Sequence, residues 1–153
     1  MRELLRQLTL FDTWANRATL RSLASVDPPP ERGVALLAHI AETERLWLDR
    51  LRGLSADIPP WLERSIEQVS SEIDTLERRW VALLESTTPD ELGRPIAYPN
   101  TSGVPFDGPP RDLIMHVILH GQEHRGQIGQ EVTAAGGEWS ETQYAWWLRD
   151  SDS

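Results

Sequence analysis

Four stretches of the chain carry apolar residues three or four positions apart, and clusters of proline or glycine separate them. This spacing places the apolar side chains on one face of a helix. Proline ends a helix because it lacks the backbone donor and clashes with the preceding turn. The pattern predicts helices over residues 2–25, 31–52, 61–86 and 110–135. The expected breaks are Pro28–Pro30, Pro59–Pro60 and Gly136–Gly137.

Residues 87–110 have a different character, because six prolines and three glycines exclude a continuous helix there. Alternating apolar residues around Asn100–Gly103 permit a short hairpin without requiring one. Four helices with one long irregular connection before the last predict an all-α fold, a four-helix bundle. We expect a single domain over residues 1–149, onto which the aromatic segment Trp139–Trp147 packs, and a frayed tail at 150–153.

The composition limits the classes of function. The net charge is −9 and every cation is an arginine, which argues against nucleic acid and anionic membranes as partners. The absence of cysteine excludes disulfides, cysteine-type zinc sites and thiol nucleophiles. No apolar run approaches the roughly 20 residues that cross a bilayer, and no signal peptide is recognisable. We therefore expect a cytoplasmic protein.

All four histidines lie in two of the predicted helices, and three of them, His116, His120 and His124, are spaced four residues apart. Each step of four residues climbs about 6 Å along a helix, so adjacent members can share one ion. His116 and His124 are about 12 Å apart along the axis, too far for metal–nitrogen bonds of about 2 Å to one ion. His120 and His124 fall within the apolar face and form the expected ligand pair. His116, at the edge of that face, is a candidate second-shell residue or general base.

His39 flanks the apolar stripe of the second predicted helix and is the candidate third ligand. Three histidines leave a coordination position for water or substrate, which distinguishes catalytic zinc sites from closed structural ones. The alternative is a hydrogen-bonded core histidine without any metal. For His39 alone that alternative is the more frequent one, whereas the paired histidines favour metal.

Several segments together resemble the DinB/YfiT-like superfamily over nearly the whole chain. The segment His116–Ile128, with its three histidines followed by Arg125, Gly126 and Gln127, is the most specific. Leu119 departs from the family pattern, where asparagine often precedes the middle histidine. The other similar segments are Phe11–Arg17, Leu37–Ile40 with Trp47–Leu48 and Gly53, Tyr98–Gly103, and Gly136–Tyr144.

The resemblance implies an up-down-down-up four-helix bundle, commonly a homodimer, with one divalent metal ion held by His39, His120 and His124. Nickel or zinc is the expected ion, with iron or manganese as alternatives. Characterised relatives include thiol-dependent S-transferases and isomerases that use a low-molecular-weight thiol, and others are linked to stress or detoxification. The resemblance thus implies a metal-dependent transferase or a hydrolase-like enzyme that acts on a small-molecule substrate. Arg125, beside His124, is a candidate contact for an anionic substrate or a thiol carboxylate, although a surface ion pair is its more frequent role.

Two other functions stay open at this point: a non-catalytic metal-binding or stress-response bundle, and a metal-free dimeric module that binds a small molecule. Smaller signals are also undecided. Glu131 is either a second-shell acceptor or a solvated carboxylate, and Asn16 either bonds near the site or caps local backbone. The last helix contains three glycines that predict a close helix approach, within the chain or across a dimer: Gly121, Gly126 and Gly129.

Overall fold

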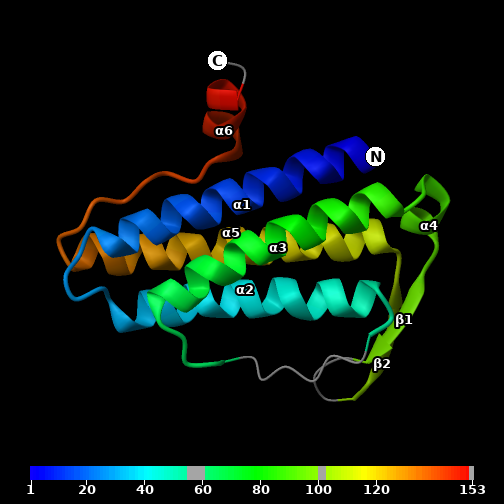
Figure 1. Cartoon of the computed structure of the whole chain (residues 1–153), viewed down its shortest axis with the longest axis horizontal. Coiled ribbons are helices and arrows are strands. Elements are labelled where there is room, and N and C mark those ends of the chain that lie inside the picture. The colour runs from blue at the N-terminus through cyan, green and yellow to red at the C-terminus, as the bar shows by residue number, and fades with distance from the viewer. Residues whose placement is uncertain (55–60, 100–102, 152–153) are drawn as a thin grey trace.

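Helices make up most of the protein, as the apolar spacing predicts. A computed structural model describes residues 1–54, 61–99 and 103–151. The four long helices are α1 (Arg2–Ala24), α2 (Glu31–Leu51), α3 (Ile66–Ser86) and α5 (Pro110–Ala134) (Figure 1). The short elements are α4 (Pro89–Gly93), β1 (Ile96–Pro99), β2 (Pro105–Gly108) and α6 (Tyr144–Ser151). The prediction of a mainly helical protein is confirmed, with a small sheet added to it.

The third long helix begins at Ile66, whereas the apolar pattern predicted a start near residue 61. Its first turn is closed by a capping box, in which the Ser65 hydroxyl accepts a hydrogen bond from the Gln68 amide. The Gln68 side chain accepts one from the Ser65 amide in return. A capped helix starts at its cap, so residues 61–65 stay outside the helix. The expected break at Pro59–Pro60 lies outside the described residues.

The connection before α5 contains more regular structure than its prolines suggested. Pro89 stands at the start of α4, where the missing amide proton costs nothing, and Thr88 with Glu91 forms a capping box. Strands β1 and β2 pair antiparallel, with Ile96 opposite Gly108. The permitted hairpin therefore has its two strands, although residues 100–102 between them are not among those described.

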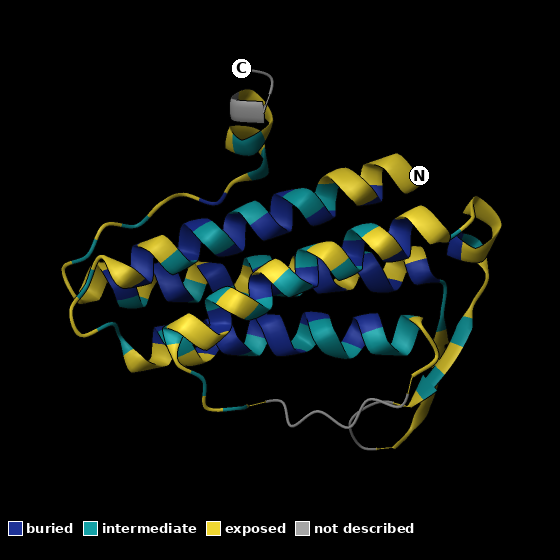
Figure 2. Ribbon diagram, in the orientation of Figure 1, coloured by how far each residue is buried: buried dark blue, intermediate teal, exposed yellow. Residues whose placement is uncertain are grey.

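The four long helices pack so that both α1 and α2 contact α3 and α5. Their buried residues lie mainly on the sides that the four helices turn toward one another (Figure 2). Two apolar clusters divide this interior. On α5 the first cluster ends at Ile118 and the second begins at Ile128, and His120 and His124 lie between them. The candidate site lies in the layer of polar side chains between the two apolar clusters.

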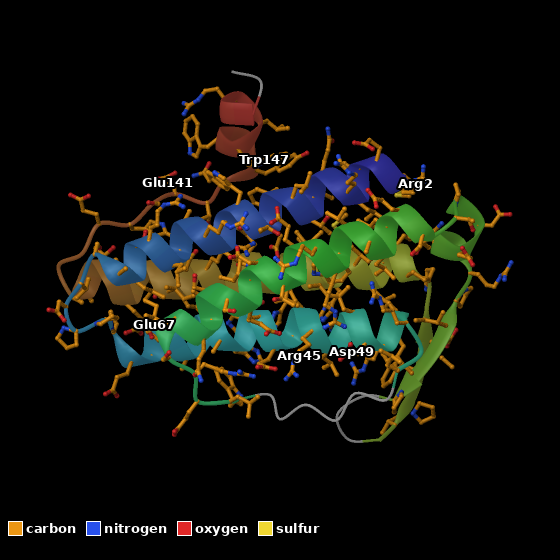
Figure 3. The ribbon with its side chains drawn as sticks, viewed as in Figure 1. Arg2, Arg45, Asp49, Glu67, Glu141 and Trp147 are labelled. Carbon is orange, nitrogen blue, oxygen red and sulfur yellow. The ribbon has the colours of Figure 1, made fainter. Side chains whose placement is uncertain are left out.

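The aromatic tail packs back on the helices, as expected. The ring of Phe11 on α1 lies 5.2 Å from that of Tyr144 and 6.1 Å from that of Trp147, measured between centroids. Trp147 projects from α6 toward α1 in Figure 3. Gly129 on α5 is in contact with Trp139, and a side chain there would collide with the indole. This glycine thus serves packing within the chain. Among the described residues, no helix has the length and apolar character needed to span a membrane.

Candidate metal centre

The structure brings together His39 from α2 with His120 and His124 from α5. The Nε2 atom of His120 lies 3.1 Å from the Nε2 of His39 and 3.1 Å from the Nε2 of His124. One ring nitrogen from each residue falls in a set whose members are all within 4.8 Å of one another. Residues 81 positions apart in the chain therefore form a triad that could hold a metal ion.

This separation of nitrogens fits a single ion. Two nitrogens bound at about 2.0–2.1 Å, with angles between about 90° and 110°, lie about 2.9–3.4 Å apart. Hydrogen bonding alone does not satisfy the triad, since the Nε2 of a neutral imidazole carries either one proton or one lone pair. His120 Nε2 therefore cannot both donate to one neighbour and accept from the other. A cation accepts all three lone pairs at once.

His120 is the triad member whose protonation is strongly disfavoured. Burial, and next the charges of His124 and His39, lower the pKa of its imidazole to about 4. The ring is therefore neutral at neutral pH, which is the form that binds metal. Its Nδ1 is buried and has no hydrogen-bond partner among the described residues. When Nε2 gives its lone pair to a metal, the proton of the neutral ring is on Nδ1, and this buried N–H has no acceptor among the described residues.

Two neighbours orient the other histidines. Gln127, one turn after His124, places its side-chain oxygen 3.0 Å from His124 Nδ1, so that the ring presents Nε2 to the triad. Trp61 stacks on the His39 ring, with the centroids 4.2 Å apart and the planes 11° from parallel. Glu131, considered from the sequence as a second-shell acceptor, instead pairs with Arg32 at 3.4 Å. Gln127, in place of Glu131, is therefore the residue that bonds to the far nitrogen of His124.

His116 lies beside the triad and outside it. Its ring centroid is 6.2 Å from that of His120, and it packs edge-on against Trp47 at 5.5 Å. The side chain is exposed, at the edge of the apolar face where helix geometry placed it. The roles predicted for His116, as a residue that supports a metal ligand or as a general base, stay predictions. Leu119, the departure from the family pattern, is 62% exposed.

Arg125 is completely buried, which neither of its expected roles anticipated. Its guanidinium donates to Asp12 Oδ1 at 2.6 Å and to Asn16 Oδ1 at 2.7 Å. The expectation of a surface ion pair is thus wrong for Arg125, because both Arg125 and its partner Asp12 are buried. Contact with an anionic substrate or thiol stays a prediction, but these donors already have protein partners. Asn16 makes side-chain bonds between helices, and so is no cap of local backbone.

A second carboxyl group completes this buried cluster. Glu44 on α2 accepts hydrogen bonds from Asn16 Nδ2 and from Trp80 Nε1, both at 2.8 Å. Burial, and next the charge of Asp12, raise the pKa of Glu44 to about 8. Burial also raises the pKa of Asp12, while the Arg125 charge opposes that rise. Since Arg125 donates to Asp12, we place the negative charge on Asp12 and the proton on Glu44.

This assignment predicts a loss of stability in mild base. A carboxyl group whose folded pKa is raised stabilises the protein below its unfolded pKa, and the contribution is lost as the pH rises through the folded pKa. We expect the unfolding free energy of metal-free protein to fall by about 1 kcal/mol between pH 7 and pH 9. Replacing Glu44 with Gln should remove this dependence. The lowered pKa of His120 acts below pH 6.5 and leaves that window unaffected.

Urea unfolding at both pH values measures the effect, and Glu77→Gln is the matched control. Glu77 is a partly exposed carboxylate in an ion pair with Arg17, so its replacement should leave the pH dependence in place. An equal fall in Glu44→Gln and in the wild type would show that another group titrates.

Sequence reasoning missed Gln127, Trp61, Asp12 and Glu44. Only Gln127 had a local signal, since it follows His124 by three residues and faces the same side of the helix. Asp12 and Glu44 were detectable only as charged residues within apolar helical stripes. Buried charges are rare unless paired, but the partner could not be read from either segment alone.

Comparison with known proteins is consistent with this geometry. The family model described as the DinB superfamily matches residues 3–128, a range that includes all three histidines of the triad. A search of curated proteins and a search of solved structures each found no match. Because the matched range covers most of the 153 residues, the chain belongs to the DinB superfamily.

Proposed function

We propose that His39, His120 and His124 bind one divalent metal ion, and that the protein is a thiol-dependent S-transferase or isomerase. The observation that carries the metal site is that His120 Nε2 lies 3.1 Å from the Nε2 atoms of both His39 and His124. A donor set made only of imidazole nitrogen suits zinc, nickel, iron or copper better than magnesium or calcium. Nickel or zinc is the ion that the family resemblance favours.

With three protein ligands, the ion would keep an open position and supply a Lewis acid that lowers the pKa of a bound water or thiol. The chain's own groups do the rest. Gln127 and Trp61 hold the rings of His124 and His39. His116, exposed beside His120, is the candidate base that takes the thiol proton at a ring nitrogen. The thiol sulfur then forms a bond to an electrophilic carbon, and the leaving group departs with the electrons of its bond.

A cavity whose wall includes Trp61, the neighbour of His39, offers room for the electrophile. It has a volume of about 640 Å³, and Trp61, which stacks on His39, forms part of its wall. Val34, Leu62 and Ile66 make the wall largely apolar, as small-molecule sites are. A smaller pocket of about 280 Å³ lies between α3, α4 and α5. Neither wall includes a triad histidine among the described residues, but Trp61 joins the larger cavity to the His39 ring, which makes that cavity the better candidate for the substrate.

We also infer that the long helices form an up-down-down-up bundle within a single domain. Figure 1 supports this order, because α1 and α5 run toward one end of the molecule while α2 and α3 run toward the other. The homodimer and the cytoplasmic location stay predictions. The domain range of 1–149 and the frayed tail also stay predictions.

A thiol screen tests the enzymatic part of the proposal. Protein loaded with Zn²⁺ or Ni²⁺ is mixed with low-molecular-weight thiols and small electrophiles. Both the loss of free thiol and the isomerisation of the electrophile are followed, because an isomerase regenerates its thiol. We expect at least one pair to react faster with the wild type than with the His120→Ala/His124→Ala double variant. Equal rates for every pair in both measurements would remove the transferase and the isomerase and leave a non-catalytic metal-binding protein.

A further inference from the structure

We infer that a buried polar network positions His120 and His124 opposite His39, an inference that rests on the proposed metal site. The polar network consists of side chains that share one hydrogen-bonded cluster between the two apolar halves of the core. Its members are Asp12, Asn16, Glu44, Trp80 and Arg125.

The polar network ties all four long helices together. Arg125 on α5 donates to Asp12 and Asn16 on α1. Asn16 donates to Glu44 on α2, which also accepts from Trp80 on α3. Each of these side chains is at most 4% exposed. Breaking one bond leaves a buried polar group unsatisfied, so the network resists any rotation or sliding of α5.

The polar network meets α5 at the residues that follow its two ligands. Arg125 comes directly after His124, and Gly121 comes directly after His120. A side-chain carbon at Gly121 would lie 3.0 Å from Arg125 Nη1 and 3.1 Å from Asp12 Oδ1. The bare backbone at this position therefore gives the ion pair its space. On α2, Glu44 follows His39 by five residues, so both helices that supply ligands are joined to the network.

Small movements of α5 matter for metal binding. A side-chain tip lies about 5–6 Å from the helix axis, so a rotation of about 10° displaces it by about 1 Å. Metal–ligand distances tolerate only about 0.2 Å. Apolar contacts in the two clusters are not directional and hold the rotation of α5 less tightly than the fixed hydrogen bonds of Arg125 do. The members of the network are thus positioning residues, which touch neither metal nor substrate.

Two glycines on the same helix provide a matched test. Gly121→Ala pushes against Arg125 and Asp12, whereas Gly126→Ala adds a side chain where no atom of the described residues lies within 4 Å. Both changes raise the helix propensity of α5 equally. We expect Gly121→Ala to weaken Zn²⁺ binding about tenfold, as the loss of outer-shell support does, and Gly126→Ala to leave it unchanged. Zn²⁺ affinity is measured by competition with a chelator, and the visible spectrum of the Co²⁺-loaded protein reports the coordination geometry.

A second pair of variants covers the case in which Gly121→Ala does not fold. Asn16→Ala removes the link between Arg125 and Glu44 while the ion pair stays. Thr19→Ala, on the same helix, removes an equally buried polar group whose hydroxyl bonds, among the described residues, to the Ala15 carbonyl alone. We expect Asn16→Ala to weaken Zn²⁺ binding about tenfold and alter the Co²⁺ spectrum, and Thr19→Ala to do neither.

The outcomes separate the two proposals. Wild-type protein that binds neither Zn²⁺ nor Co²⁺ would overturn the metal site and the positioning role with it. Wild-type affinity and spectrum in folded Gly121→Ala or in Asn16→Ala would overturn the positioning role alone. Equal losses of Zn²⁺ affinity in a network variant and its control would also overturn the positioning role, because a general loss of stability would explain both.

Discussion

Replacing His120 or His124 with alanine should abolish metal binding, whereas replacing His116 should preserve most of it. Wild-type protein reconstituted with Zn²⁺ should contain about one ion per chain, as a three-histidine site requires. Loss of one of three ligands should lower the affinity by more than the about 10–100-fold that outer-shell changes cause. His116 lies 6.2 Å from His120 between ring centroids and belongs to no ligand set among the described residues, so His116→Ala should lower the affinity less than about tenfold.

Elemental analysis of untagged protein and chelator competition measure these differences. His39→Ala should behave like the two α5 variants, because His39 Nε2 is as close to His120 as His124 Nε2 is. Retention of one ion per chain in His120→Ala would exclude the proposed triad. Loss of the ion in His116→Ala alone would show that the ligand set is a different one.

Removing the charge of Arg125 should destabilise the metal-free protein by about 3–5 kcal/mol, the cost of breaking a buried ion pair on one side. In Arg125→Met the long side chain still fills space, but Asp12 is left buried without its counter-charge and Asn16 without its donor. This is a large fraction of the stability of a typical domain. Urea unfolding at pH 7 in the presence of a chelator gives the value without a contribution from metal.

Arg17→Met is the control for that measurement. Arg17 donates to Asp74 at 2.7 Å and to Glu77 at 2.8 Å, but its side chain is 39% exposed. Water screens such a pair, so its loss should cost at most about 1 kcal/mol. Similar losses of unfolding free energy in Arg17→Met and Arg125→Met would mean that burial does not set the strength of the Arg125–Asp12 ion pair.

The part of the candidate site that lies within one helix could be predicted from the chain alone. His120 and His124 are neighbours because four residues make slightly more than one helical turn, whatever the rest of the protein does. The same rule separated His116 from the pair. Gln127 was within reach of the same reasoning, since residues three apart also share a face.

The short elements were harder to predict because their signals conflict locally. Pro89 and Gly93 count as helix breakers, yet they begin and end α4. Ser65 with Gln68 marks the start of α3 more accurately than the apolar pattern, which extends back to residue 61. In both places a capping box decided the boundary, because it satisfies backbone amides that apolar spacing does not describe.

The four long helices, their inward faces and the local pair of histidines follow from the order of residues in the chain, because each depends on the number of residues per helical turn. Only the tertiary structure decided that His39 meets that pair, and that Arg125 turns inward to Asp12 rather than outward to solvent. Such contacts depend on the register and rotation between helices distant in the chain. That register is set by the sum of many packed side chains and a few buried hydrogen bonds, which no single segment of the sequence contains.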